Sequence, residues 1–159
     1  MNPRSTPPLD HLGTDDPGLS LVRLTAELQS IREELDATIR LASHDALTGL
    51  PNRRTITERL ADAVDQSSGE GGVAAMFIDV DRFKVINDSV GHAAGDDLLR
   101  EFGHLLESHR RPQDFLGRIG GDEFALVLTD CSLPEAEEIG RSLLAATNQL
   151  RFVWDGAVH

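Results

Sequence analysis

Two pairs of acidic residues in the middle of the sequence have the types and spacing of metal ligands. Asp79 and Asp81 stand two apart at the end of the apolar run VAAMFIDV (Val73–Val80), and Asp122 and Glu123 follow two glycines in GRIGGDEFALVL. Residues two apart on a strand point to the same face. If the second pair packs beside the first, the converging carboxylates repel one another unless a divalent cation lies among them. The pattern predicts a Mg²⁺ site suited to phosphoryl or nucleotidyl transfer; the alternative is a strand that simply leaves the core.

Side chains between the two acidic pairs could bind a nucleotide. Lys84 is the only lysine among 15 basic residues, and a compact ammonium group suits a phosphate. Asn87 offers a hydrogen-bond donor and an acceptor, and Asp96 offers acceptors, so together they could read the edge of a purine such as guanine. The alternative is turn chemistry around Asn87, with Asp96 as a helix N-cap.

The apolar spacing along the chain predicts the elements that would hold these side chains. An unbroken apolar run such as Val73–Val80 indicates a buried central strand, and FLGRI and FALVLT indicate the two strands of a hairpin. This order of elements predicts an α/β (α+β) sandwich, with helices covering a sheet that contains antiparallel strands. The predicted elements are a helix over 19–44, a helix over 54–66, a strand over 73–80, a turn-rich stretch over 87–95, a helix over 96–110, the hairpin, a helix that starts around Ser132 and Pro134, and a final strand entry that stops short in RFVWDGAVH.

The first predicted helix carries a short heptad seam. Its apolar residues recur at alternating spacings of three and four, which fits either an amphipathic helix packed on its own domain or a parallel two-stranded coiled coil. The segment before it, residues 1–18, is rich in proline and polar residues and is predicted to be disordered. The seam consists of Leu21, Leu24, Leu28, Ile31 and Leu35.

The bulk composition restricts partners and compartment. A chain of 159 residues suits one domain with an appendage. Its net charge of −12 argues against non-specific binding of DNA, RNA or an anionic membrane. Cys131 is the only cysteine, so an intrachain disulfide is excluded. No apolar run has the length of a membrane span and the first 20 residues lack a secretory signal, so a cytoplasmic location without membrane contact is expected.

Three ordered motifs resemble one protein family. DALTGLPNRR, FIDVDRFKVINDSVGHAAGDDLL and RIGGDEF are similar to the motifs of the GGDEF family of diguanylate cyclases, from Asp45 to about Leu150. The resemblance implies the palm-like fold of nucleotide cyclases and polymerases. It also implies an enzyme that uses Mg²⁺ or Mn²⁺ to condense two GTP into cyclic di-GMP, releasing two pyrophosphates. Because each site of such an enzyme holds one GTP, the resemblance implies a homodimer and favours the coiled-coil interpretation.

The resemblance also assigns roles to individual residues. It implies that Asp79, the backbone carbonyl of Val80 and Asp122 hold the metal. Glu123 matches the second acid, which binds metal and activates the attacking 3′-hydroxyl. The remaining matches are Lys84, Arg82 and Phe83 for the phosphates, Asn87 and Asp96 for guanine, and Leu47 and Leu99 as apolar walls of the base pocket.

A further match precedes the glycines. Arg111 and Asp114 have the Arg-x-x-Asp form of the family's inhibitory product site, at its expected offset. An arginine fork suits a bidentate grip on phosphate and guanine. Alone, this four-residue pattern would indicate a solvated surface; with the resemblance, it implies a site that binds cyclic di-GMP.

The sequence departs from the family at its C-terminal end. The chain ends at His159, whereas family members continue with a strand of Ser-Ile-Gly type and a helix with basic residues. We therefore expect a GGDEF fold without its last strand and helix, in which VAAMFIDV forms an apolar sheet edge. The expected regions are a disordered segment 1–18, a signalling helix 19–44 and an incomplete GGDEF domain 45–159. The alternative function is an inactive module that serves as a cyclic di-GMP receptor or a dimerisation module.

Overall fold

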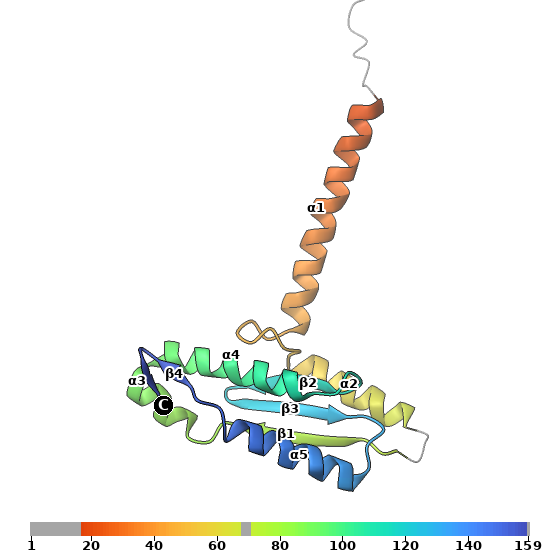
Figure 1. Ribbon diagram of the computed structural model, residues 1–159. Helices are drawn as coiled ribbons and strands as arrows, with labels where there is room; N and C mark the ends of the chain where they lie inside the picture. The colour runs from red at the N-terminus through yellow and green to blue at the C-terminus, as the bar shows by residue number, and fades with distance from the viewer. Residues whose placement is uncertain (1–16, 68–70, 159) are drawn as a thin grey trace, which may run out of the picture. The chain divides into compact units, whose positions relative to one another are not determined.

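The computed structural model describes residues 17–67 and 71–158. They form two compact units, one ending at Ile39 and the other beginning at Arg40. The second unit contains the sheet and its covering helices (Figure 1). Among the described residues, no helix combines the length and the apolar character that crossing a membrane requires.

The first unit is the greater part of helix α1 (Pro17–Ser43), which confirms the helix predicted over 19–44. The helix begins two residues inside the segment predicted to be disordered, and the rest of that segment lies outside the described residues. Every side chain of the predicted seam is exposed, Leu21 at 65% and Leu35 at 56%. The seam therefore leaves a line of apolar side chains in contact with solvent.

The second unit is built on a three-stranded sheet with the order β1-β3-β2. Strand β3 (Glu123–Leu128) lies between β1 (Ala74–Asp79) and β2 (Phe115–Gly120), and both pairings are antiparallel (Figure 1). Central β3 is buried along nearly its whole length, whereas β1 alternates between half-buried and exposed residues. The predicted hairpin is confirmed. The prediction of a buried central strand over Val73–Val80 is wrong, because β1 lies at an edge of this sheet and every second residue of it is exposed.

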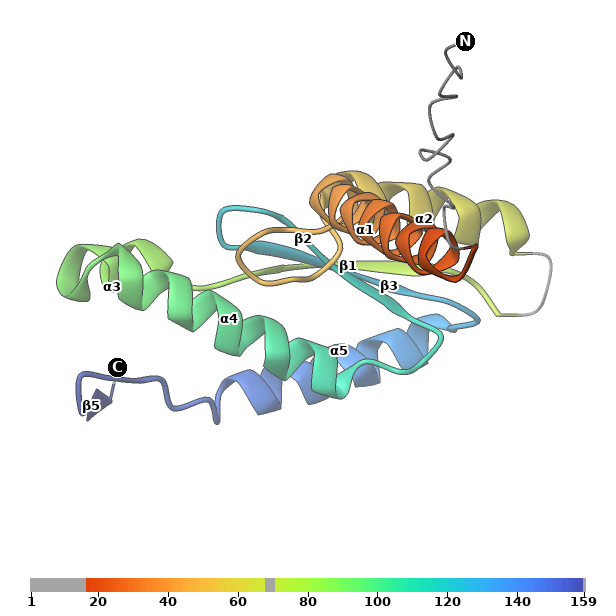
Figure 2. The same ribbon diagram turned by 90° about the horizontal axis from the view of Figure 1, so that it is seen from above.

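Helices cover the two faces of the sheet. Figure 2 shows α2 (Arg53–Gln66) on one side and α4 (His92–His109) with α5 (Leu133–Thr147) on the other. Because side chains alternate along a strand, β3 serves both layers. The set packed with α4 and α5 includes Phe124, Leu126 and Leu128, and the set packed with Ile56 of α2 includes Ala125 and Val127.

Side-chain caps are present at the starts of two helices. The side chain of Asn52 accepts a hydrogen bond from the Thr55 N–H at the start of α2. Ser132 and Glu135 form a reciprocal capping box at the start of α5, next to a proline in the first turn. These caps satisfy backbone donors that the first helical turn leaves unpaired.

The stretch predicted to be turn-rich, 87–95, is largely helical. Helix α3 (Phe83–Val90) is followed by α4, which begins at His92 rather than at residue 96. Only Gly91, with φ of +91°, separates the two helices, and this backbone region favours glycine. Asp96 is therefore inside α4 and is not its N-cap. The sequence suggested a turn because Asn, Asp and Ser are poor helix formers, but packing of the partly buried apolar side chains of α3 against α4 overrides that preference.

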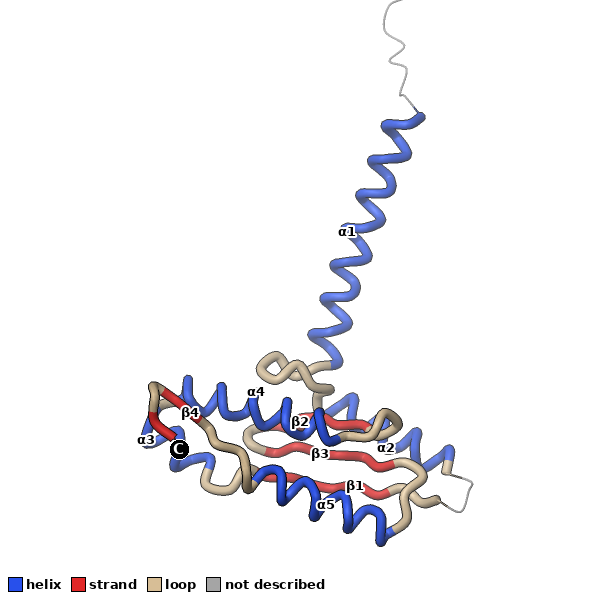
Figure 3. The backbone as a smooth tube through the Cα atoms, viewed as in Figure 1, coloured by secondary structure: helices blue, strands red, loops and turns tan. Residues whose placement is uncertain are grey.

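The apolar residues that stabilise α3 belong to a small cluster of their own. Phe83, Ile86 and Val90 pack around buried Ala94 and Leu98 of α4, and Phe152 and Trp154 belong to the same cluster. The last segment was predicted as a strand entry; instead, β4 (Val153–Trp154) and β5 (Ala157–Val158) form a short ribbon separate from the three-stranded sheet (Figure 3).

Candidate active site

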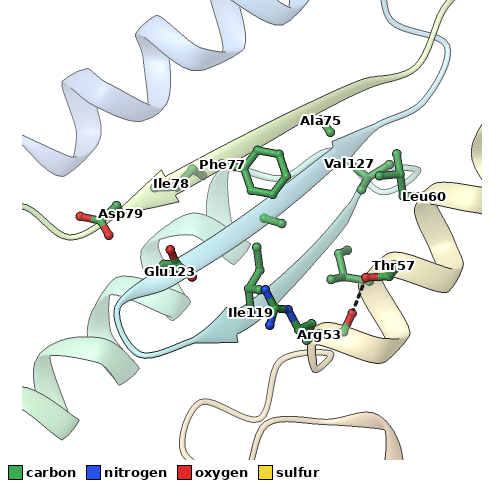
Figure 4. Close-up of a pocket in the computed structure, with 12 residues that line it drawn as sticks. Arg53, Thr57, Leu60, Ala75, Phe77, Ile78, Asp79, Ile119, Glu123 and Val127 are labelled. Atoms are coloured by element: carbon green, nitrogen blue, oxygen red, sulfur yellow. Dashed lines mark hydrogen bonds between the residues drawn. The ribbon is translucent and has the colours of Figure 1, made fainter.

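The strand register brings two of the predicted metal ligands together. Asp79, the last residue of β1, is the direct antiparallel partner of Glu123, the first residue of β3. Figure 4 shows both carboxylates at the same end of the two strands. Both residues are exposed, and neither takes part in an ion pair with another described residue. Two acids placed in this way can share a cation that enters from solvent.

Asp122 lies in the tight turn just before Glu123. Gly120 and Gly121 have φ of +152° and +55°, a conformation that glycine adopts without strain. Within 17–67 and 71–158, no three or more His, Cys, Asp or Glu side chains are gathered into a group that could hold a metal ion. The structure thus pairs Asp79 with Glu123 but does not bring Asp122 into a three-carboxylate cluster with them.

The segment after β1 differs from its expected strand geometry. The strand ends at Asp79, so Asp81 lies in a turn and the same-face argument does not apply to it. The Val80 carbonyl accepts a hydrogen bond of 3.1 Å from the Phe83 N–H, which leaves its second lone pair for another partner. Arg82 has a left-handed backbone, with φ of 62°.

The residues matched to phosphate binding have different surroundings. Arg82 and Lys84 are exposed, and Lys84 lies in the first turn of α3. The side chain of Phe83 packs against the core. The Phe83 side chain is therefore a core residue, and its main-chain N–H already donates to the Val80 carbonyl.

The residues matched to guanine recognition come from two adjacent helices. Asn87 is half-buried on α3, and Asp96 is exposed on α4. Leu99 is 2% exposed and belongs to the main core, against which Leu47 packs. Leu99 is thus chiefly a core residue, and the half-buried Leu47 is the more open of the two predicted walls.

An ion pair that sequence reasoning missed holds the acidic turn in place. Arg118 of β2 donates from Nη1 to Asp45 Oδ1 at 2.8 Å, and from Nε and Nη2 to the Gly121 carbonyl at 3.0 and 2.6 Å. Thr48 donates to the same Asp45 oxygen from its backbone N–H and its hydroxyl group. Both partners lie in quoted motifs, DALTGLPNRR and GRIGGDEF, yet no local pattern links residues 73 positions apart.

The Asp45 carboxyl is stabilised in its charged form. Partial burial alone would raise its pKa, but hydrogen bonds from Arg118 and Thr48 outweigh burial and hold the pKa below its usual value. The Asp45 backbone also bonds to Leu50 and Gly49. The start of the domain and the turn that carries Asp122 are thereby joined through one carboxylate.

The predicted product-site residues bind each other. Arg111 donates from Nε and Nη2 to the two oxygens of Asp114, at 2.7 and 2.8 Å. The Thr129 N–H donates to Asp114 as well, and Arg111 Nη2 reaches the Thr129 carbonyl. Asp114 is 1% exposed, whereas part of the Arg111 side chain remains in contact with solvent. This bidentate pair fastens the loop before β2 to the end of β3.

Two cavities border the edge strand. One, of about 360 Å³, lies on the α2 side of the sheet and runs from Leu60 to Asp79 and Glu123 (Figure 4). The other, of about 810 Å³, lies between β1, α4 and α5 and reaches Asp79 and Arg82. Asp79 borders both cavities, so the acidic end of β1 is open on either face of the sheet.

Comparison with known proteins identifies the family to which this site belongs. Residues 42–159 match the family described as "Diguanylate cyclase, GGDEF domain". The chain belongs to the GGDEF domain family. The three motifs had predicted this family, and the GGDEF fold preceded by a helix is confirmed.

Individual relatives match the chain over more residues than the family model does. The chain is 42% identical over 146 residues to the probable diguanylate cyclase DgcE of Escherichia coli K12, covering 91% of this chain and 13% of DgcE. The crystal structure of the coiled coil and GGDEF domain of DgcB from Caulobacter crescentus in complex with c-di-GMP matches with a TM-score of 0.79 and 25% identity, over 91% of this chain and 76% of that chain.

A second solved structure has a higher sequence identity to this chain than DgcB has, but a lower TM-score. The diguanylate cyclase SiaD from Pseudomonas aeruginosa, crystallised with its activator SiaC, matches with a TM-score of 0.69 and 35% identity, over 88% of this chain and 55% of that chain. The GGDEF chain described here thus spans about an eighth of the length of DgcE and about half of the crystallised SiaD chain.

Proposed function

We propose that this GGDEF domain condenses two GTP molecules into cyclic di-GMP and releases two pyrophosphates. The observation that carries the proposal is the register that sets Asp79 opposite Glu123 at the open end of the sheet. The 42% identity to DgcE, described as a probable diguanylate cyclase, supports the same reaction.

The donors at this end of the sheet suit Mg²⁺ or Mn²⁺. Carboxylate and carbonyl oxygens are the hard ligands that these ions take. Asp79, the Val80 carbonyl, Asp122 and Glu123 would hold the ion, with Asp122 turning toward the other two acids. When bound, such an ion offsets the charge of the triphosphate at the reacting phosphorus.

The chain's own residues supply the remaining steps of the proposed reaction. Glu123 accepts the proton of the attacking 3′-hydroxyl at its carboxylate. Lys84 and Arg82, both exposed in the segment that follows Asp79, bind the phosphates, with the loop at Phe83 beside them. Asn87 and Asp96 hold the guanine edge, with Leu47 and Leu99 beside the base.

The product contains two nucleotides, so we propose that two copies of the domain face each other. The exposed seam of α1, from Leu21 to Leu35, supports pairing through a parallel coiled coil. The DgcB structure that resembles this chain contains a coiled coil joined to its GGDEF domain. In this proposal, residues 19–44 form the dimerising signalling helix and residues 45–159 the catalytic domain.

We further propose that Arg111 and Asp114 form a site at which cyclic di-GMP inhibits the enzyme. Asp114 holds the guanidinium group of Arg111 in a fixed plane, which prepares its solvent-facing side for a phosphate or a guanine edge. A chain that binds cyclic di-GMP there without forming it would instead be a receptor, which is the second candidate function.

The decisive experiment incubates the chain with GTP and Mg²⁺ and separates the products by chromatography. We expect cyclic di-GMP from the unmodified chain and at least a hundredfold less from Glu123→Gln, because a general base typically contributes 10²–10⁴-fold. Glu137→Gln, on the exposed face of α5, is the matched control and should leave the rate unchanged. Equal rates for Glu123→Gln and the unmodified chain would refute the proposed role of Glu123.

Calorimetry with cyclic di-GMP separates the two candidate functions. The enzyme proposal expects both turnover of GTP and binding of the product. Binding with no product formed from GTP at any protein concentration would refute the enzyme and support the receptor. Sedimentation of the unmodified chain tests the dimer, and a monomer at high concentration would contradict it.

A further inference from the structure

A glycine lies in the contact between α3 and α4. Gly95 is buried in α4, one residue before Asp96, and faces the side chain of Asn87 on α3. A Cβ atom added to Gly95 would lie 2.0 Å from Asn87 Oδ1 and 3.0 Å from Asn87 Cγ. The missing side chain at position 95 is therefore what gives the Asn87 amide its present place.

We propose that Gly95 is a specificity-determining residue that positions Asn87 for guanine. This inference rests on the proposed function, in which Asn87 and Asp96 read the base. Asn87 can recognise guanine only if its amide keeps the position that serves the base, and the absence of a side chain at Gly95 leaves that position open. Gly95 itself contributes no polar side-chain group and acts only through Asn87.

The surroundings determine which group would move if position 95 carried a methyl group. Phe83, the other neighbour, would lie 3.1 Å from the added carbon through its ring carbon Cζ, and its side chain is fixed by the core. The amide of Asn87 is the end of a flexible side chain that can rotate to another rotamer. An alanine at position 95 would therefore displace the Asn87 amide rather than the helix.

The helix itself should tolerate the change. Alanine favours a helix interior more than glycine does, and Gly95 is not among the glycines with a positive φ. Gly95→Ala should then weaken guanine recognition without unfolding the domain, whereas a core defect would impair both stability and recognition. The folded state should persist, because the gain in helix propensity opposes the tight contact with the Phe83 ring.

A second glycine in α4 provides a matched control. A Cβ atom at Gly103 would lie 3.3 Å from Leu50 Cδ1, 3.6 Å from Phe124 and 3.7 Å from Thr48. These contacts need only a small adjustment, and none involves a residue proposed to bind nucleotide. Gly103→Ala thus makes the same chemical change in the same helix without disturbing Asn87.

The test measures GTP and ATP affinities in the presence of Mg²⁺, by calorimetry, for the full 159-residue chain and its variants. We expect a preference for GTP in the unmodified chain and in Gly103→Ala. In Gly95→Ala the affinity for GTP should fall roughly tenfold, as expected for the loss of a hydrogen-bonding group, while the affinity for ATP stays the same. The melting temperature of Gly95→Ala should stay within a few degrees of that of the unmodified chain, which would show that the variant folds.

A double-mutant cycle with Asn87→Ala tests whether Gly95 acts through Asn87. Gly95→Ala should cause no further loss of GTP affinity when Asn87 is already alanine. An unchanged GTP preference in Gly95→Ala, or an equal loss in both backgrounds, would overturn the inference. If the unmodified chain shows no preference for GTP, the proposed function fails and this inference fails with it. That outcome is seen in the unmodified chain alone, so it is distinguishable from a failure of the inference, which is seen only in the variants.

Discussion

Two arginine–aspartate pairs brace the two ends of β2, and they differ in reach and burial. Arg111 and Asp114 are close in sequence, and the Asp114 side chain has no exposed surface. Arg118 bonds to Asp45 from 73 residues away, and both side chains are partly exposed, at 11% and 24%. The local pair joins a loop to the end of β3, whereas the distant pair joins the acidic turn to the start of the domain. We therefore expect the local pair chiefly to stabilise the fold and the distant pair chiefly to hold the geometry of the site.

Removing Arg111 should have the largest effect on stability. Arg111→Ala leaves a buried carboxylate without its cation, and we expect a loss of about 3 kcal/mol in the free energy of unfolding. Urea denaturation followed by circular dichroism measures this change.

The matched control for this variant is an exposed ion pair on α2. The side chains of Arg54 and Glu58 are 66% and 62% exposed, so Arg54→Ala should change the free energy of unfolding by less than about 0.5 kcal/mol. If Arg111→Ala and Arg54→Ala cost the same, burial of Asp114 does not set the strength of the local pair.

Removing Arg118 should cost less stability but more activity. In Arg118→Ala, Asp45 can turn to water, so we expect a loss of about 1–2 kcal/mol. The Gly121 carbonyl loses both of its side-chain donors, and the turn that carries Asp122 is released. We expect cyclic di-GMP formation to fall about tenfold or more, because small displacements of catalytic groups are costly.

Arg118→Lys tests whether the planar guanidinium group of Arg118, and not its charge alone, holds the acidic turn. Lysine keeps the charge but cannot reach Asp45 and Gly121 with one planar fork, so activity should remain low although part of the stability returns. The proposed difference between the two pairs would be contradicted if the Arg111→Ala variant, shown to be folded, lost as much cyclic di-GMP formation as Arg118→Ala.

The smallest expected effect is a change in pH dependence. The pKa of Asp45 is lowered in the folded state, so its contribution is fully present above the unfolded value of about 3.9 and is lost as the pH falls through the folded value. At pH 7 the free energy of unfolding of the unmodified chain should exceed that of Asp45→Asn by about 1 kcal/mol. This difference should shrink below about pH 4. Denaturation at a series of pH values tests it, and a difference that stays constant down to pH 3 would contradict the assignment.

The sequence predicted the elements that carry a strong local signal. The apolar run that ends in Asp79 became β1, and the glycine-separated runs around Asp122 became the hairpin. Ser132 and Pro134 marked the start of α5, where Ser132 and Glu135 form a cap between neighbouring residues. Each prediction relied on a pattern confined to a few positions, which is the range over which spacing and capping are informative.

The remaining features depend on contacts between distant residues. Helix α3 was missed because Asn87 and its neighbours favour turns when considered alone, and the apolar cluster that stabilises the helix includes Phe152 from the end of the chain. The bond between Arg118 and Asp45 has no sequence period, because the fold alone brings the two together. The close approach of Gly95 to Asn87 likewise depends on the way that α3 crosses α4.

The position of β1 at the sheet edge has a consequence for amide hydrogen exchange. Among the described residues, β1 pairs with β3 alone, whereas β3 pairs on both sides. Successive amides of an antiparallel strand point alternately to its two sides, so every second amide of Ala74–Asp79 faces away from β3. Exchange measured by NMR should therefore alternate between slow and fast along β1 and remain slow throughout β3. Uniformly slow exchange along β1 would show that its outer side is protected in solution.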